Sequence, residues 1–133
     1  MKPIQLITIL VISMVTGCTI PAEIELYNNS GVSITVEFDE KSFKINPNKE
    51  ALFGGEHGSK FSVNMDDKVL YYEMGRLALS NIEFVGWGPF TKRVFRAQIE
   101  SNGFIWAVGS EQSYPVSNFI EQPEGFPVEP KKV

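Results

Sequence analysis

Residues 32–38 have the sequence VSITVEF, in which an apolar side chain at every second position alternates with a polar one. A period of two is typical of a β-strand that buries one face and exposes the other. The same period recurs from Glu23 onward, and no stretch of about eleven residues sustains a helical period without a Gly or Pro. These patterns predict an all-β fold.

The first expected hairpin joins this stretch to the apolar residues Ile24 and Leu26. A three-residue loop at 29–31 would place Leu26 opposite Ile34 and Ile24 opposite Val36, so that both apolar sets share one face. The loop would also end in a glycine, the residue that a three-residue hairpin favours at its last position. We therefore expect the two strands to be neighbours in one sheet.

Two further hairpins are expected from the same test. A two-residue turn at Asp66-Asp67, whose carboxylates we assign to turn formation rather than to acid–base chemistry or calcium binding, gives the facing pairs Val63 with Leu70 and Phe61 with Tyr72. A type I′ turn at Asn102-Gly103 gives the facing pairs Ile99 with Trp106 and Ala97 with Val108.

Weaker strand patterns complete the fold prediction. They lie at residues 42–45, 51–53 and 82–85, while residues 75–80 could be a strand continuation or one helical turn. Roughly seven to nine short strands separated by turns are typical of an antiparallel β-sandwich or a small barrel. The Pro-rich residues 122–133 favour an extended tail, which would either pack Phe126 and Val128 over a sheet edge or remain a mobile or partner-docking arm.

The composition excludes several classes of function. The 133 residues suit one domain, and 43% of them are hydrophobic. The net charge is −4 and no run of Lys or Arg exceeds two residues, so we expect no nucleic-acid partner. A single Cys and a single His cannot form an intrachain disulfide or a multi-cysteine metal site, and we expect no metal and no other cofactor.

Residues 1–17 indicate a targeting segment. Lys2 is followed by an apolar run at residues 4–15, which is shorter than the about 20 residues that a transmembrane helix needs. Residues 15–18, Val-Thr-Gly-Cys, then resemble the lipobox of bacterial lipoprotein signal peptides. The resemblance implies cleavage between Gly17 and Cys18, diacylglycerol on the Cys18 thioether and acylation of the new N-terminus. An ordinary thiol behind a secretory signal, or an uncleaved anchor, is the alternative.

The resemblance also implies a bacterial cell envelope, with the membrane as a partner through the lipid on Cys18. The residue after Cys18 is Thr19 and not Asp, which resembles the pattern of lipoproteins that are sorted to the outer membrane. The domain would then face the periplasm. Cleavage would leave 116 of the 133 residues: a short linker at 18–22, a β domain at 23–121 and the tail at 122–133. The four residues after the lipidated Cys18, at 19–22, reach at most about 13–14 Å, so the domain would lie against the bilayer.

The candidate catalytic residues are Glu56, His57 and Ser59, which share a Gly-rich loop. Histidine-assisted hydrolysis needs a nucleophile beside the imidazole and a carboxylate that orients it. No nucleophile-elbow motif accompanies these three residues, and a solvated loop is the simpler interpretation. We therefore expect no catalytic site, with a small envelope hydrolase as the alternative.

The candidate partner-binding residues are Trp87, Phe90, Arg96 and Tyr71. The first two lie in the turn-rich segment 86–90, which could instead close one end of the core. Arg96 should point outward beside Gln98 on a solvated face, and Tyr71 should be exposed if its neighbour Tyr72 faces the core. We expect a non-enzymatic domain that binds an envelope protein or glycan, in an accessory, inhibitor or immunity-type role.

The lipidation hypothesis predicts the behaviour of Cys18→Ser. Without the thiol there is no acceptor for the lipid, so the variant should leave the membrane fraction or accumulate as uncleaved precursor. Fractionation and intact-mass measurement check both outcomes, with Ser13→Ala as the control. Mature Cys18→Ser protein that still partitions with membranes through its N-terminus would refute the hypothesis.

Overall fold

The computed structural model describes residues 22–54, 60–74, 82–85 and 91–131, and this part of the chain consists of strands and loops without a helix. The strands are β1 (Ala22–Asn29), β2 (Ile34–Phe38), β3 (Lys41–Ile45), β4 (Glu50–Phe53), β5 (Lys60–Met65), β6 (Lys68–Glu73), β7 (Ile82–Val85), β8 (Lys92–Glu100) and β9 (Ile105–Ala107). Among these residues there is accordingly no helix long and apolar enough to cross a membrane. The predicted targeting segment and Cys18 lie outside the described residues.

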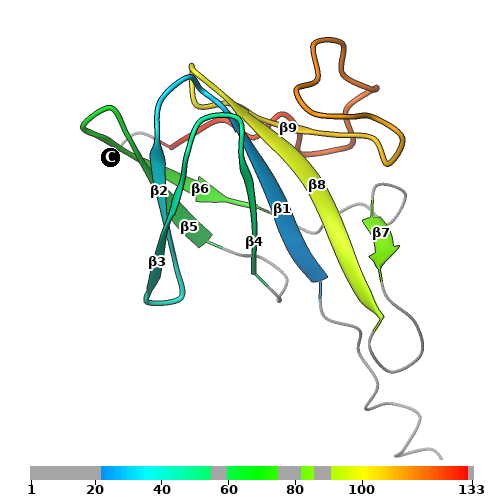
Figure 1. The fold of residues 1–133 in the computed structure, drawn as a ribbon, viewed down its shortest axis with the longest axis horizontal. Helices are drawn as coiled ribbons and strands as arrows, with labels where there is room; N and C mark the ends of the chain where they lie inside the picture. The colour runs from blue at the N-terminus through cyan, green and yellow to red at the C-terminus, as the bar shows by residue number, and fades with distance from the viewer. Residues whose placement is uncertain (1–21, 55–59, 75–81, 86–90, 132–133) are drawn as a thin grey trace, which may run out of the picture.

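The strands form two sheets (Figure 1). Sheet A has five strands in the order β4-β1-β8-β7, with β9 also paired to β8, and sheet B has four in the order β3-β2-β5-β6. The all-β prediction is confirmed, and the two sheets do not close into a barrel. The expectation of purely antiparallel pairing is wrong for one pair, because β1 runs parallel to β8 along its whole length.

The two sheets share one apolar core. Side chains from both sheets belong to a single buried cluster, including Leu26 and Phe95 of sheet A and Val36 and Val63 of sheet B. The Phe53 ring of β4 makes the aromatic contacts between the sheets, with centroid distances of 5.8 Å to Phe38, 5.4 Å to Phe43 and 5.2 Å to Phe61. Such tilted and edge-on pairs are favourable beyond the area that they bury.

The predicted hairpin between β1 and β2 is wrong. β1 pairs with β4 and β8, whereas β2 pairs with β3 and β5 in the other sheet. The apolar faces of the two strands therefore meet across the core instead of side by side. Alternation identifies the buried face of a strand, but it does not identify the strand's neighbour.

A buried asparagine holds the chain where it passes from sheet A to sheet B. The Asn28 side chain is fully buried, and its Nδ2 donates to the carbonyl oxygens of Val32 at 2.7 Å and Ile45 at 3.0 Å. Its Oδ1 accepts from the Ser30 amide at 3.0 Å and from the Ser30 hydroxyl at 2.6 Å. All the polar atoms of this side chain are thus used to stabilise the corner.

The hairpin between β5 and β6 is confirmed with its register. Phe61 lies opposite Tyr72 and Val63 opposite Leu70. Asp66 and Asp67 have φ angles of 53° and 62°, the left-handed conformation that a type I′ turn needs at both positions. Turn formation is therefore the structural role of these two carboxylates.

The hairpin between β8 and β9 exists, but its predicted register is wrong by one residue. Ile99 lies opposite Ile105 and Ala97 opposite Ala107, around the three-residue loop at 101–103. Gly103 ends this loop with a φ of 85°, and the shift leaves Ile105 and Ala107 fully buried. Trp106 consequently points away from the core.

The weaker strand patterns are confirmed as β3, β4 and β7, whereas residues 75–80 fall outside the described part of the chain. The tail packs against both sheets. Val128 and Ile105 exchange two backbone hydrogen bonds of 2.8 and 3.0 Å, and Lys131 N donates to Tyr71 O at 2.8 Å. The Phe126 ring lies 4.9 Å from the Phe95 ring. Residues 126–131 therefore connect sheet A to the β6 edge of sheet B.

The Asn28 corner predicts a stability difference. Asn28→Ala should lower the free energy of unfolding by about 1–3 kcal/mol, because the carbonyl of Ile45 loses this buried donor and the Ser30 amide loses its acceptor. Urea denaturation measures this loss. The control is Ser33→Ala, which removes an exposed hydroxyl bonded to Asn46 and should cost less than about 0.5 kcal/mol. Equal effects of the two substitutions would contradict the role of Asn28.

Candidate functional site

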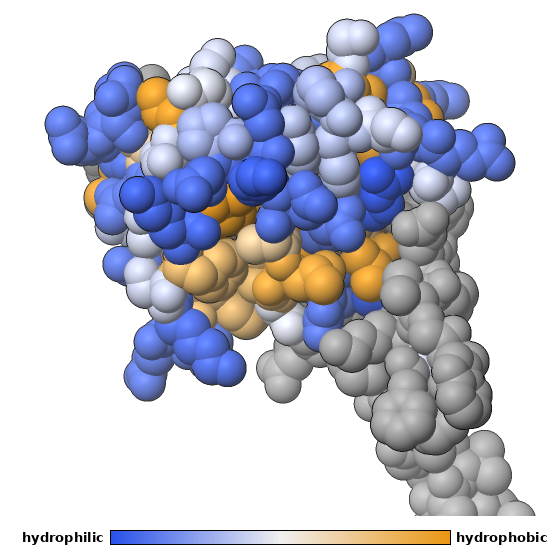
Figure 2. Space-filling model, viewed as in Figure 1, coloured by the Kyte–Doolittle hydropathy of each residue, from blue (hydrophilic) through white to orange (hydrophobic). Residues whose placement is uncertain are grey.

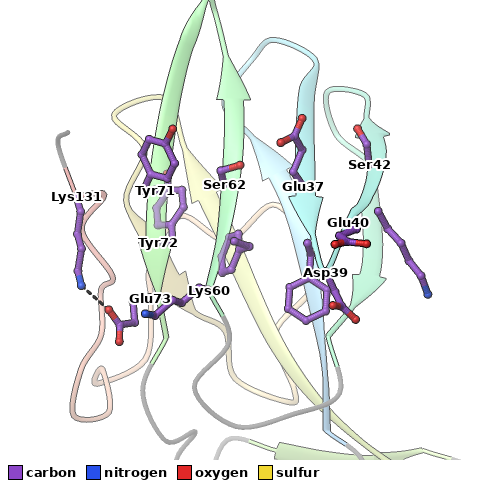
Figure 3. Close-up of a pocket in the computed structure, with 13 residues that line it drawn as sticks. Glu37, Asp39, Glu40, Ser42, Lys60, Ser62, Tyr71, Tyr72, Glu73 and Lys131 are labelled. Carbon is purple, nitrogen blue, oxygen red and sulfur yellow. Dashed lines mark hydrogen bonds and ion pairs between the residues drawn. The ribbon is translucent and has the colours of Figure 1, made fainter.

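The outer face of sheet B carries a hollow of about 590 Å³. It is lined by outward-facing residues of all four strands of the sheet, by the turn between β2 and β3, and by the tail residue Lys131 (Figure 3). The core-side rings of Phe38, Phe61 and Tyr72 also contribute to its lining. We call this the sheet-B hollow. Its size is within the range of small-ligand sites, about 300–1,000 Å³.

A row of four polar or aromatic side chains crosses the centre of the sheet-B hollow. The row consists of Ser42, Glu37, Ser62 and Tyr71, which are successive cross-strand partners from β3 to β6. Neighbouring strands lie about 4.7–4.9 Å apart, so the row extends over roughly 14 Å. Strand pairing holds these side chains in place, which gives a more rigid arrangement than a loop would.

Two adjacent tyrosines show which side of β6 is available to a ligand. Tyr71 is 44% exposed, whereas Tyr72 is 2% exposed. The Tyr72 hydroxyl donates to Gly103 O at 2.6 Å, and burial raises the pKa of this hydroxyl above its usual range. The predicted exposure of Tyr71 is thus confirmed, and Tyr72 serves the core.

The charges around the hollow are unevenly distributed. Lys131 Nζ lies 2.6 Å from Glu73 Oε2, and this hydrogen bond, followed by the charges of Lys131 and Lys60, lowers the pKa of Glu73. Figure 3 shows Lys60, Glu73 and Lys131 on one side of the hollow and Glu37, Asp39 and Glu40 on the other. The hollow therefore has an acidic side on β2 and its turn, and a basic side on β5, β6 and the tail.

The corresponding outer face of sheet A is covered by the chain itself. Residues 109–119 lie over it, and the Tyr114 ring stacks on Tyr27 at 4.6 Å while the Phe119 ring stacks on Trp106 at 4.9 Å. The fully buried Gln98 accepts from Val116 N at 2.8 Å and donates to Val116 O at 2.9 Å. This face is therefore closed to a partner at β8.

Arg96 is part of that cover, and the prediction that it lies on a solvated face is wrong. Its side chain is only 12% exposed. Nη1 donates to the carbonyl oxygens of Gly109 at 2.8 Å and Gln112 at 2.7 Å, and the guanidinium lies 4.5 Å from the Tyr114 ring centroid. Alternation placed Arg96 on the correct face, but the segment that packs over this face is more than ten residues away in sequence.

Five further candidate residues were predicted from the sequence. Trp87 and Phe90, as well as Glu56, His57 and Ser59, lie outside the described residues. Figure 2 shows an apolar band on the molecular face of Figure 1, and it borders residues drawn in grey. The sheet-B hollow is the site whose lining the structure describes.

The chemistry of the sheet-B hollow suits binding. It offers hydroxyls, carboxylates, ammonium groups and aromatic rings, and no hydrogen bond joins Ser42 or Ser62 to a base within the described chain. Among residues 22–54, 60–74, 82–85 and 91–131, no group of three or more His, Cys, Asp or Glu is placed to hold a metal ion. Of the lining residues, sequence reasoning identified Tyr71 alone.

No protein-family model, curated protein or solved structure matches this chain. Its function is therefore inferred from the chemistry of its own surfaces.

The cover over sheet A predicts a specific effect of Arg96→Lys. A lysine keeps the charge but lacks the planar donor fork that reaches several carbonyls, so the free energy of unfolding should fall by about 1–3 kcal/mol. Hydrogen exchange should also accelerate at residues 109–116. Lys44→Arg, at an exposed position of β3, is the control and should change stability by less than about 0.5 kcal/mol. Unchanged exchange in Arg96→Lys would contradict the covering role.

Proposed function

We propose that this protein is a lipid-anchored, non-enzymatic binding protein of the bacterial cell envelope, and that the sheet-B hollow is its binding surface. The two sheets would act as a β-sandwich scaffold. The observation that carries the proposal is the contrast between the outer faces. The chain covers sheet A at β8 with its own residues, whereas sheet B exposes Tyr71 among charged side chains.

The anchoring part of the proposal rests on the lipobox at residues 15–18. Lipidated Cys18 would hold the domain on the outer membrane, facing the periplasm, within about 13–14 Å of the bilayer through four linker residues. Its partner would be another component of the envelope, a protein or a glycan. The accessory, inhibitor or immunity-type roles that we infer all require such a partner.

Three properties of the hollow support a binding role. It lies on paired strands, which present a ligand with a preformed surface. It contains the half-exposed ring of Tyr71, and tyrosines are enriched among the residues that dominate binding energy. The carboxylates of Glu37, Asp39 and Glu40 make no hydrogen bond or ion pair with other described residues, so they are available to a ligand.

Site-specific photo-crosslinking tests the proposal. A photo-reactive aromatic residue in place of Tyr71, in otherwise wild-type protein in its own membrane, should capture a discrete envelope component. The same residue at Ser113, which is exposed on the cover of sheet A, is the control and should capture at least about threefold less of it. Equal products from both positions, or none from position 71, would refute the assignment of the hollow.

The hydrolase alternative has its own test. Glu56→Ala with His57→Ala should leave the crosslink from position 71 unchanged if the protein is a binding protein. Loss of that crosslink in a variant with unaltered unfolding would favour the alternative. Capture of the partner would then depend on the proposed catalytic residues.

A further inference from the structure

We propose that the ligand of the sheet-B hollow is a short extended peptide segment that carries both a cationic and an anionic group. This inference rests on the proposed function and specifies the ligand class for the same site. The cationic group would bind on the acidic side of the hollow, at Glu37 and the turn after β2. The anionic group would bind on the other side, at Lys60.

The acidic side has an excess of negative charge. Glu37, Asp39 and Glu40 contribute three carboxylates, and Lys41 is the lysine that follows them in the lining. Asp39 and Glu40 are exposed and both have positive φ angles, 50° and 62°, so the tight turn presents them at the end of the strand pair. A ligand ammonium or guanidinium would neutralise part of this excess.

The basic side has one surplus positive charge. Lys60 and Lys131 both lie near Glu73, and the 2.6 Å contact between Lys131 and Glu73 satisfies that carboxylate. No carboxylate lies within ion-pair distance of Lys60 among the described residues, although Glu73 is its cross-strand partner. The Lys60 ammonium is thus the group that a ligand carboxylate would reach.

The distance between the two sides matches a short peptide. The acidic side belongs to β2 and its turn, and the basic side to β5, β6 and the tail, so the axis that joins them crosses the strands. Glu37 and Lys60 lie on the neighbouring strands β2 and β5, and because Glu37 pairs with Ser62, their Cα atoms are diagonal neighbours about 7–8 Å apart. Two residues that share one face of an extended chain, at positions i and i+2, are about 7 Å apart and match this spacing. Ser42 and Ser62 would meet its backbone amides, and Tyr71 would pack against its side chains.

The charge pattern disfavours the other candidate ligands. An uncharged glycan seated over the carboxylates would remove water from them without supplying a partner, which weakens binding. A uniformly anionic polymer would be repelled by the acidic side, and a uniformly cationic one by Lys60. A ligand with both signs avoids all of these penalties.

Peptide titration tests the inference on the lipidated full-length protein in detergent micelles. The probes are acetyl-Lys-Ala-Glu-amide and its reversed sequence, whose charged residues share one face of an extended chain. Acetyl-Gln-Ala-Gln-amide is the uncharged control peptide, and cellotetraose is the glycan. At low salt, at least one charged peptide should bind about threefold to thirtyfold more tightly than the uncharged peptide, the range that two exposed ion pairs supply. The preference should fall sharply in 1 M NaCl, where the screening length is about 3 Å.

Matched variants connect this preference to the hollow. Glu37→Gln and Lys60→Gln should each reduce the preference by about twofold or more, while Glu50→Gln and Lys68→Gln, exposed residues outside the hollow, should not change it. Thermal melting confirms that each variant folds. An equal reduction by the control substitutions would overturn the assignment to the hollow.

Two further outcomes would overturn the inference. In the first outcome, cellotetraose or the uncharged peptide binds as tightly as the tighter-binding charged peptide. In the second outcome, none of the peptides binds. If the residue at position 71 still captures an envelope component in either case, the proposed function stands and only the ligand class is wrong. If capture at position 71 also fails, both proposals fail.

Discussion

The buried side-chain amide of Asn28 donates to the carbonyls of Val32 and Ile45, and these hydrogen bonds hold the point at which the chain leaves sheet A and enters sheet B. An amide buried without partners would be costly, so the corner is stable in one arrangement. The crossing places β2 beside β5 and not beside β1. Glu37 and Ser62 are cross-strand partners as a result, and the central row of the sheet-B hollow depends on this pairing.

The C-terminal third of the chain determines how different the two outer faces are. Residues 109–119 close over sheet A through Arg96, Gln98 and stacked aromatic rings. The tail then reaches the edge of sheet B and adds Lys131 to the rim of the hollow. One segment therefore removes a potential binding face, and the next completes another. The difference between the two faces therefore comes from residues 109–131, which follow the last strand, β9.

The candidate site was only partly predictable from sequence, for a physical reason. Tyr71 could be assigned to the exposed face because its neighbour Tyr72 pairs with Phe61 across a two-residue turn, which is a local relation. Arg96 was assigned to the correct face of β8, but a segment from later in the chain covers it. The other residues of the hollow were missed because a cross-strand row exists only when the order of the strands is known, and the sequence pattern leaves that order open.

Alternation of apolar and polar residues determined from the sequence alone that the protein is all-β, which side of most strands is buried, and that β5 and β6 form a hairpin with its register. These properties depend on residues close together in the chain, where side-chain period and turn conformation act directly. The tertiary structure alone decided that β1 and β2 lie in different sheets, that β1 runs parallel to β8, and that sheet B keeps an open, charged outer face. Those features depend on contacts between distant residues, such as Asn28 with Ile45 and Arg96 with Gln112, whose formation is determined by packing of the whole core and not by any local pattern.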